Sequence, residues 1–212
     1  DMPLQALPVV RNDEVGHLTV AFNQLLDKLH TSQVALERMA HHDSLTGLPN
    51  RVLLADRMQQ GLARARRNRT WIAVLYLDLD GFKPINDELG HEAGDRALIE
   101  VAHRLSATLR RSDTLARIGG DEFVLLATDL SGDWQESAIS LASKCIVTLS
   151  AGVDLGGKTC PLGASIGIAA SAGHDTPDAI LLAADQAMYD AKRAGRGRYA
   201  MATDRRDGTR VS

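Results

Sequence analysis

Two short apolar runs with Gly119-Gly120-Asp121-Glu122 between them limit most strongly how this chain can fold. One run ends at Ile118 and the other covers 123–127, a pattern that predicts a β-hairpin with its turn at the glycines. Glycine accepts positive φ angles and the close approach of a ligand, while adjacent carboxylates at a turn point into solvent or toward a metal. Taken alone, the segment favours a simple polar turn. Its function depends on the rest of the chain.

The continuous apolar run 71–77 has the length of a strand buried on both faces, and it ends in Asp78-Leu79-Asp80. Open α/β sheets bind ligands at such strand ends. Alternate residues of a strand share a face, so Asp78 and Asp80 could point the same way, and pairing with the hairpin would bring Asp121 within reach. Converging carboxylates suit Mg²⁺ better than Zn²⁺. The alternative is a solvated strand end.

Periodic patterns predict the remaining elements. Strands are expected at 161–170 and 198–201, and helices at 51–67, 83–90, 93–109, 134–151 and 177–193. From residue 71 this order predicts an α/β fold, a central sheet flanked by helices. Residues 204–212 are expected to form a disordered tail.

Composition excludes several classes of protein. The 212 residues, 44% hydrophobic, suffice for one domain plus an appendage, and a net charge of −3 gives no case for binding a nucleic-acid polymer. The two cysteines lack metal-ligand spacing and are expected to be reduced, as in a cytosolic domain. No apolar run reaches the roughly 18 residues of a membrane span, so the chain is expected to be soluble. Because it begins with Asp1, we expect it to be a piece of a longer protein.

The first forty residues carry a separate pattern. Apolar residues alternate at spacings of three and four, interrupted once by Ser32, which predicts a coiled coil that pairs as a parallel dimer. The alternative is an amphipathic helix packed on its own domain. The positions are Val15, Leu18, Phe22, Leu25, Leu29, Ser32, Leu36 and Met39.

Part of this segment, from Asp13-Glu14-Val15-Gly16 through Phe22-Asn23 to Leu29, resembles the second half of a HAMP domain. HAMP domains lie just inside the membrane in bacterial receptors. The resemblance implies that a missing N-terminal region carries the other HAMP helix and a membrane span. The chain would then be the cytoplasmic part of a sensor anchored in the inner membrane, in contact with the membrane only through that region.

Two groups of polar residues lie outside the hairpin. Asn86 offers a donor and an acceptor and Asp95 offers acceptors, so together they could read the edge of a guanine, although such residues are more often helix caps. Lys192 and Arg196 stand beside Gly195 and Gly197 in a basic turn. They are suited to terminal phosphates, or they are partners of a helix dipole.

These motifs, in this order and spacing, resemble the GGDEF diguanylate cyclases over 41–201. The resemblance implies a cyclase-like or palm-like sheet and a division into 1–40, 41–203 and 204–212. The matching segments are the opening Asp43-Ser44-Leu45-Thr46-Gly47-Leu48-Pro49-Asn50-Arg51, Leu77-Asp78-Leu79-Asp80-Gly81-Phe82-Lys83, Asn86-Asp87, Gly90-His91, Gly94-Asp95, Arg117-Ile118-Gly119-Gly120-Asp121-Glu122-Phe123, Met188-Tyr189-Asp190-Ala191-Lys192 and Arg196.

Site roles follow from the resemblance, position by position. Asp78, Asp121 and the Leu79 carbonyl would hold Mg²⁺ or Mn²⁺, and Asn86 with Asp95 would bind guanine. Asp121 is also the implied general base, with Glu122 as a second acid of the signature and His91 close to the transferring phosphate. Lys83 is implied both as a catalytic residue and as a substrate contact. The remaining substrate contacts would be Gly81, Phe82, Gly119, Gly120, Lys192 and Arg196.

The implied reaction joins two GTP molecules into cyclic di-GMP with release of two pyrophosphates. Each domain of this family holds one GTP, so two domains must face each other, and a coiled-coil homodimer would bring them together. One alternative is a catalytically silent module that only binds GTP or cyclic di-GMP. Another is a cyclase that uses ATP, against which Asn86 and Asp95 argue.

Arg110 and Asp113 resemble the RxxD site through which cyclic di-GMP inhibits members of this family. An arginine fork and a carboxylate suit the edges of a guanine. The alternative is a surface ion pair of little energetic value.

Overall fold

The computed structural model describes residues 7–8 and 13–202. The chain divides into two compact units, the first ending at His42 and the second beginning at Asp43. The tail expected at 204–212 lies outside the described residues. Within the described part of the chain, no helix is both long and apolar enough to span a membrane.

The first unit is dominated by one helix, α1 (Glu14–His41), 28 residues long. The expected helix is therefore present. Its apolar positions are open to solvent along its length, with 69% of Leu18 and 73% of Met39 exposed. A coiled-coil partner for this stripe stays a prediction. The other exposed positions of the stripe are Phe22, Leu25, Leu29 and Leu36.

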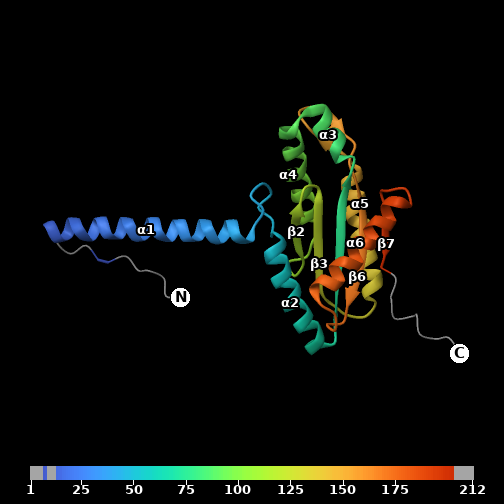
Figure 1. Ribbon diagram of the computed structural model, residues 1–212, viewed down its shortest axis with the longest axis horizontal. Coiled ribbons are helices and arrows are strands. Elements are labelled where there is room, and N and C mark those ends of the chain that lie inside the picture. The colour runs from blue at the N-terminus through green and yellow to red at the C-terminus, as the bar shows by residue number, and fades with distance from the viewer. Residues whose placement is uncertain (1–6, 9–12, 203–212) are drawn as a thin grey trace. The chain divides into compact units, whose positions relative to one another are not determined.

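The second unit is built on a five-stranded sheet with strand order β2-β3-β1-β6-β7 (Figure 1). The central strand β1 (Trp71–Asp80) runs antiparallel to both neighbours, β3 (Glu122–Leu130) and β6 (Gly163–Ser171). The edges are β2 (Thr114–Gly119), antiparallel to β3, and β7 (Tyr199–Met201), parallel to β6. The predicted class, a central sheet flanked by helices, is confirmed, and the sheet is mostly antiparallel.

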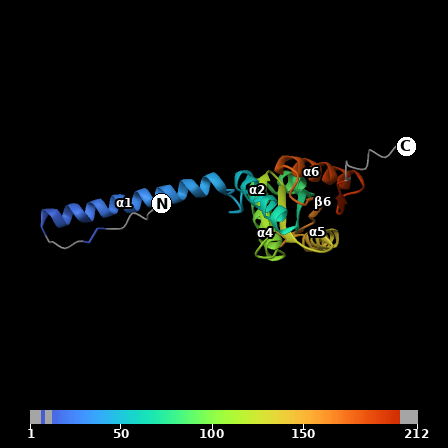
Figure 2. The ribbon, with the colours of Figure 1, turned by 90° about the horizontal axis from the view of Figure 1, so that it is seen from below.

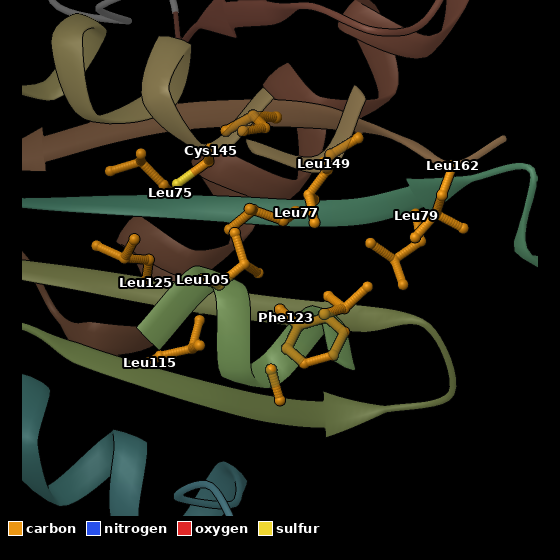
Figure 3. Close-up of a cluster of buried hydrophobic side chains, with 14 of the residues drawn as sticks. Leu75, Leu77, Leu79, Leu105, Leu115, Phe123, Leu125, Cys145, Leu149 and Leu162 are labelled. Carbon is orange, nitrogen blue, oxygen red and sulfur yellow. The ribbon is translucent and has the colours of Figure 1, made fainter. Parts of the chain in front are cut away.

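Helices cover both faces of this sheet. Figure 2 shows α2 (Arg51–Asn68) and α6 (Pro177–Arg193) on one side, with α4 (His91–Ala107) and α5 (Trp134–Ser150) on the other. The short helix α3 (Phe82–Leu89) follows β1 directly. Because side chains of a strand alternate, Leu75, Leu77 and Leu79 pack toward α4 and α5 (Figure 3), whereas Val74 and Tyr76 pack toward α2 and α6. Asp78 and Asp80 continue the second set.

Strand β1 runs to Asp80, so the two aspartates lie at its C-terminal end, as expected. The expected elements omit one pair of strands. A small hairpin, β4 (Val153–Asp154) with β5 (Thr159–Cys160), was not expected, because two-residue strands are too short to show an alternating pattern. Gly156 and Gly157 take positive φ in its turn, and this pair of glycines was the available signal.

Close packing joins α6 to β6. A β-carbon built on Gly167 of β6 would overlap backbone atoms of Ala184 and Met188 in α6, so this strand position must be glycine for the helix to sit where it does. At the far end of β1, Trp71 stacks on Trp134 with ring centroids 5.2 Å apart. Cys145 and Cys160 are free and buried, and burial raises the pKa of Cys145 to about 11.

Candidate functional site

The hairpin pairs with β1, which is the arrangement that the sequence predicts would bring Asp121 within reach of Asp78. Asp78 lies opposite Glu122, and the Leu79 amide donates to the Asp121 carbonyl at 3.3 Å. The hairpin and the Asp-Leu-Asp segment therefore meet at one end of the sheet, on the face that α6 and α2 cover. This register and the backbone hydrogen bond bring Asp121 next to the end of β1 that carries Asp78, as the sequence predicted for a paired hairpin.

The hairpin turn has a defined and supported backbone. Gly120 takes φ +45°, and a β-carbon on Gly120 or Gly119 would meet nothing within 4 Å, so the two glycines leave open space there. The Arg117 guanidinium donates to the Gly120 carbonyl at 2.8 and 3.0 Å. The same guanidinium forms an ion pair with Asp43 at 2.9 Å, with the Arg117 side chain only 12% exposed. Arg117 thus ties the opening turn of the domain to the tip of the hairpin.

Electrostatics at the strand end centre on Asp78. Its carboxylate pairs with the Lys192 ammonium of α6 at 2.7 Å. Burial raises the pKa of Asp78, the hydrogen bond from Lys192 opposes the rise, and the negative charge of Asp121 adds to it. Crowded, partly buried carboxylates of this kind are more stable with a cation between them.

Glu122 points to the same face and has a different partner. Burial raises the pKa of Glu122, and a hydrogen bond from the Tyr76 hydroxyl opposes the rise. The charges of Asp78 and Asp185 add to it. The pKa of Tyr76 is raised above its usual range by burial and by Glu122 and Asp185. Sequence reasoning missed Tyr76 and Asp185. The alternation along β1 was the available signal for Tyr76.

The donors at this end fit a hard divalent cation. Asp78, Asp121 and the Leu79 carbonyl offer only oxygen, the ligand type that Mg²⁺ and Mn²⁺ prefer, and water and phosphate would complete an octahedron. In the described ranges, no three His, Cys, Asp or Glu side chains converge as a ready-made metal site. Mg²⁺ in proteins is commonly bound by one or two carboxylates, with waters and substrate phosphates as its other ligands.

Helices α3 and α4 bring Asn86 and the Gly94-Asp95 segment together. A β-carbon built on Gly94 would overlap the Asn86 side-chain oxygen, so the carboxamide rests directly on the backbone before Asp95. Asp95 is exposed, Asn86 is half-buried, and His91 is the exposed first residue of α4. Neither Asn86 nor Asp95 is the N-cap of its helix; glycines occupy both caps.

The N-terminus of α3 forms a backbone cradle beside Asp80. Gly81 is the N-cap with φ +88° and has no side chain to satisfy the first amides. Phe82 is buried beneath this turn and Lys83 is exposed above it. Such an N-terminus favours anions, because its amides point outward and the helix dipole is positive there.

The basic turn after α6 lies at the same sheet end. Lys192 lies in the last turn of the helix, and the Arg196 guanidinium lies 3.7 Å from Asp80. Asp80 also accepts hydrogen bonds from Ser165 Oγ and from the Gly197 amide. Ser165 is fully buried and was another residue that sequence reasoning missed.

Arg110 and Asp113 belong to a separate pocket of about 250 Å³ against α5. The Arg110 amide donates to the Asp113 carboxylate at 3.1 Å, which closes a turn before β2. The wall contributed by α5 carries Glu136, Ser140 and Lys144. The two residues therefore line a polar cavity with charges of both signs.

Comparisons with known proteins agree on one family. The family model described as "Diguanylate cyclase, GGDEF domain" matches residues 40–198. The diguanylate cyclase TpbB of Pseudomonas aeruginosa is 44% identical over 193 residues, which cover 87% of this chain and 44% of TpbB. The chain thus spans less than half the length of this curated relative.

Solved structures share the fold. A structure of the TpbB GGDEF domain matches with a TM-score of 0.73 at 45% identity, covering 77% of this chain and 95% of that one. The coiled coil and GGDEF domain of DgcB from Caulobacter crescentus, in complex with c-di-GMP, matches with a TM-score of 0.78, covering 90% of this chain and all of that one. The identity to DgcB is 24%, so this likeness shows the fold alone.

Proposed function

The chain belongs to the GGDEF family of diguanylate cyclase domains, and on that basis we propose that it condenses two GTP molecules into cyclic di-GMP and two pyrophosphates. The observation that carries the proposal is the meeting of Asp78 and Asp121 at one sheet end beside Lys192. Two carboxylates at the end of a rigid sheet and a lysine from the helix packed on it provide what phosphoryl transfer requires: a metal-binding site and a phosphate ligand in fixed positions.

Asp78, Asp121 and the Leu79 carbonyl would hold Mg²⁺, with Mn²⁺ as a substitute. When bound, the metal would neutralise charge on the phosphates and lower the cost of ionising the attacking hydroxyl. Asp121 would accept the proton of the 3′-hydroxyl as general base. Glu122, held by Tyr76, would supply further negative charge beside it, and His91 would lie near the transferring phosphate.

Substrate recognition is divided between two regions. Asn86 and Asp95 would read the guanine, because a carboxamide and a carboxylate match its donor and acceptor edge. The close contact between Asn86 and Gly94 supports this assignment. The phosphates would be held by the amides of the α3 cradle and by cations around it. These residues are Gly81, Phe82, Lys83, Lys192 and Arg196, with Gly119 and Gly120 making room at the hairpin.

One domain provides half of the reaction site, so a second copy of the chain must supply the other GTP. We propose that α1 pairs with its counterpart as a parallel coiled coil. The exposed stripe from Leu18 to Met39 supports this, because pairing would bury it. Residues 13–29 are proposed to be the second half of a HAMP domain in a sensor anchored in the inner membrane. Segment 1–40 would then relay the input to the catalytic domain 41–203.

The pocket with Arg110 and Asp113 is proposed to bind cyclic di-GMP and to inhibit the enzyme. The guanidinium and the carboxylate can each pair with a guanine edge. The two residues line a cavity against α5, which favours a binding site over the alternative of a simple surface ion pair.

The test is product analysis. The protein is incubated with GTP and Mg²⁺ at several protein concentrations, and cyclic di-GMP is measured by chromatography. We expect product, with specific activity rising with concentration as dimers form. Asp121→Asn, a change in the turn just before β3, should abolish turnover. Asp129→Asn, a matched change near the other end of β3 where the carboxylate pairs with Arg64, should not. A folded dimer that binds GTP and makes no product would favour the silent binding module.

A further inference from the structure

The two aspartates of Asp-Leu-Asp face the same side of β1 yet have different partners. Asp78 pairs with Lys192 at 2.7 Å and feels the charge of Asp121. Asp80 is engaged by protein donors on both oxygens. Ser165 Oγ lies 3.0 and 2.9 Å from Oδ1 and Oδ2, and the Gly197 amide lies 3.0 Å from Oδ2.

The burial of this arrangement indicates a structural contact and not a loose surface one. The Asp80 side chain is 12% exposed, and Ser165 on the neighbouring strand β6 is fully buried. In the register of the sheet, Asp80 lies opposite Gly163 of β6. Strand β6 supplies the Ser165 hydroxyl that holds the Asp80 carboxylate.

The turn at residues 194–197 depends on such a contact. Gly195, Arg196 and Gly197 have φ of +118°, +60° and +58°, and for Arg196 this is a costly backbone conformation that the surroundings must maintain. The Gly197 amide donates to Asp80, and the Arg196 amide donates to the Ala191 carbonyl at 3.2 Å. Asp80 therefore ties the turn to the end of β1.

We propose that Asp80 is a positioning residue: with Ser165 it holds the turn at 194–197, and so places Arg196 for the phosphates of GTP, without serving as a metal ligand. The inference rests on the proposed function in that it takes the nucleotide to be GTP. Under this proposal the two aspartates, which look equivalent in the sequence, have different roles: Asp78 binds the cation and Asp80 holds the turn.

Asp80→Asn and Asp80→Ala distinguish this role from metal binding. Asparagine can accept from Gly197 through its oxygen and donate to Ser165 through its amide, so only the charge toward Arg196 is lost. Alanine loses every contact. A metal ligand would behave otherwise, because a carboxamide replaces a coordinating carboxylate poorly. Asp78→Asn serves as the comparison for a loss of metal binding.

The measurements are Mn²⁺ binding without nucleotide, followed by electron paramagnetic resonance, and binding of α,β-methylene-GTP with Mg²⁺, followed by calorimetry. This analogue cannot release pyrophosphate, because a methylene group replaces the bridging oxygen that would leave. Asp80→Ala should raise the Kd for α,β-methylene-GTP about tenfold or more, and Ser165→Ala about threefold to tenfold. Asp80→Asn should stay within about threefold. All three should keep the Mn²⁺ affinity of the wild type, and Asp78→Asn should lose it.

Ser171→Ala is the matched control, since Ser171 is equally buried on β6 and holds a different turn at Gly173. The Ser171→Ala change should leave binding of α,β-methylene-GTP unchanged. In an Arg196→Ala background, Ser165→Ala should add little further loss, because the serine acts through the arginine. If the two substitutions weakened nucleotide binding additively, Ser165 would not act through Arg196.

The proposal is overturned if Asp80→Asn loses Mn²⁺ binding as Asp78→Asn does, or if Ser165→Ala binds α,β-methylene-GTP as the wild type does. Should Asp80→Ala fail to fold, the Asn and Ser165 variants still decide. Wild-type protein that binds α,β-methylene-GTP but yields no cyclic di-GMP from GTP removes the proposed reaction and leaves this inference standing. Wild-type protein that does not bind α,β-methylene-GTP overturns both.

Discussion

Replacing Gly94 by alanine should weaken GTP binding without weakening the fold. Gly94 is buried in α4, and a β-carbon there would overlap the Asn86 side-chain oxygen and lie 2.9 Å from its Cγ. The backbone of Gly94 has an ordinary helical φ, so alanine meets no backbone strain. The new methyl group must therefore turn the Asn86 carboxamide away or push α3 from α4.

The size of the effect follows from two opposing terms. Alanine is favoured over glycine inside a helix by about 1 kcal/mol, which offsets the cost of moving one flexible side chain. If Asn86 binds guanine as proposed, its displacement forfeits a donor and an acceptor to the base, each worth about 1 kcal/mol net. A loss of about 2 kcal/mol raises the KM for GTP about 30-fold. Discrimination against ATP should fall by a similar factor, because the carboxamide belongs to the proposed guanine site.

The assay is initial-rate pyrophosphate release with GTP and with ATP, alongside thermal unfolding. Gly61→Ala in α2 is the matched control: it also fills a helical glycine, but its β-carbon meets Thr128 at an ordinary 3.4 Å. It should keep KM and raise Tm slightly. An unchanged KM and an unchanged preference for GTP in Gly94→Ala would refute the assignment of Asn86 to guanine.

Three other predictions concern packing, pH and inhibition. Gly167→Ala should lower Tm by about 5 °C or more, because its β-carbon overlaps the α6 backbone, and calorimetry measures this; an unchanged Tm would contradict the packing argument. Despite burial, hydrogen bonds from Thr46 and Arg117 hold the pKa of Asp43 below its usual value, so its stabilisation is present above the unfolded-state pKa and lost as pH falls through the lower folded-state value. Asp43→Asn should therefore unfold more easily than wild type in urea at pH 7 and at pH 5, with the gap closing as the pH falls below the ordinary aspartate pKa; a gap independent of pH would exclude the carboxylate as its cause. Finally, Arg110→Ala should relieve inhibition of GTP turnover by added cyclic di-GMP, while Arg111→Ala, the neighbouring arginine outside the residues that line the pocket, should not; equal inhibition of both would remove the pocket from regulation.

Much of the sheet could be predicted because its signals are local. The apolar run before Asp78 is long enough to identify a strand buried on both faces, and the glycines at 119–120 mark the hairpin turn. From these two elements the pairing of Asp78 with the Asp121-Glu122 tip follows, and the structure has that register. The β4–β5 hairpin was missed because no pattern of alternation fits in two residues.

Contacts between distant segments could not be predicted, since no local pattern encodes them. Arg117 reaches Asp43 across 74 positions, and the Gly197 amide reaches Asp80 across 117. In the sequence, Asp78 and Asp80 flank Leu79 and look equivalent. Only the placement of Ser165 on β6 and of the turn after α6 gives them different partners.

The stacked pair at the start of β1 gives the molecule an internal optical reporter. Trp71 and Trp134 are the two tryptophans of the whole chain, so their coupled absorption and emission carry no background from other indoles. Trp134 opens α5, one turn before Ser137 in the wall of the Arg110 pocket, whereas Trp71 starts the strand whose other end holds Asp78 and Asp80. Emission should therefore respond to cyclic di-GMP at its proposed site against α5 and change little when nucleotide binds at the proposed site at the sheet end, so that the two binding events can be measured separately without a label.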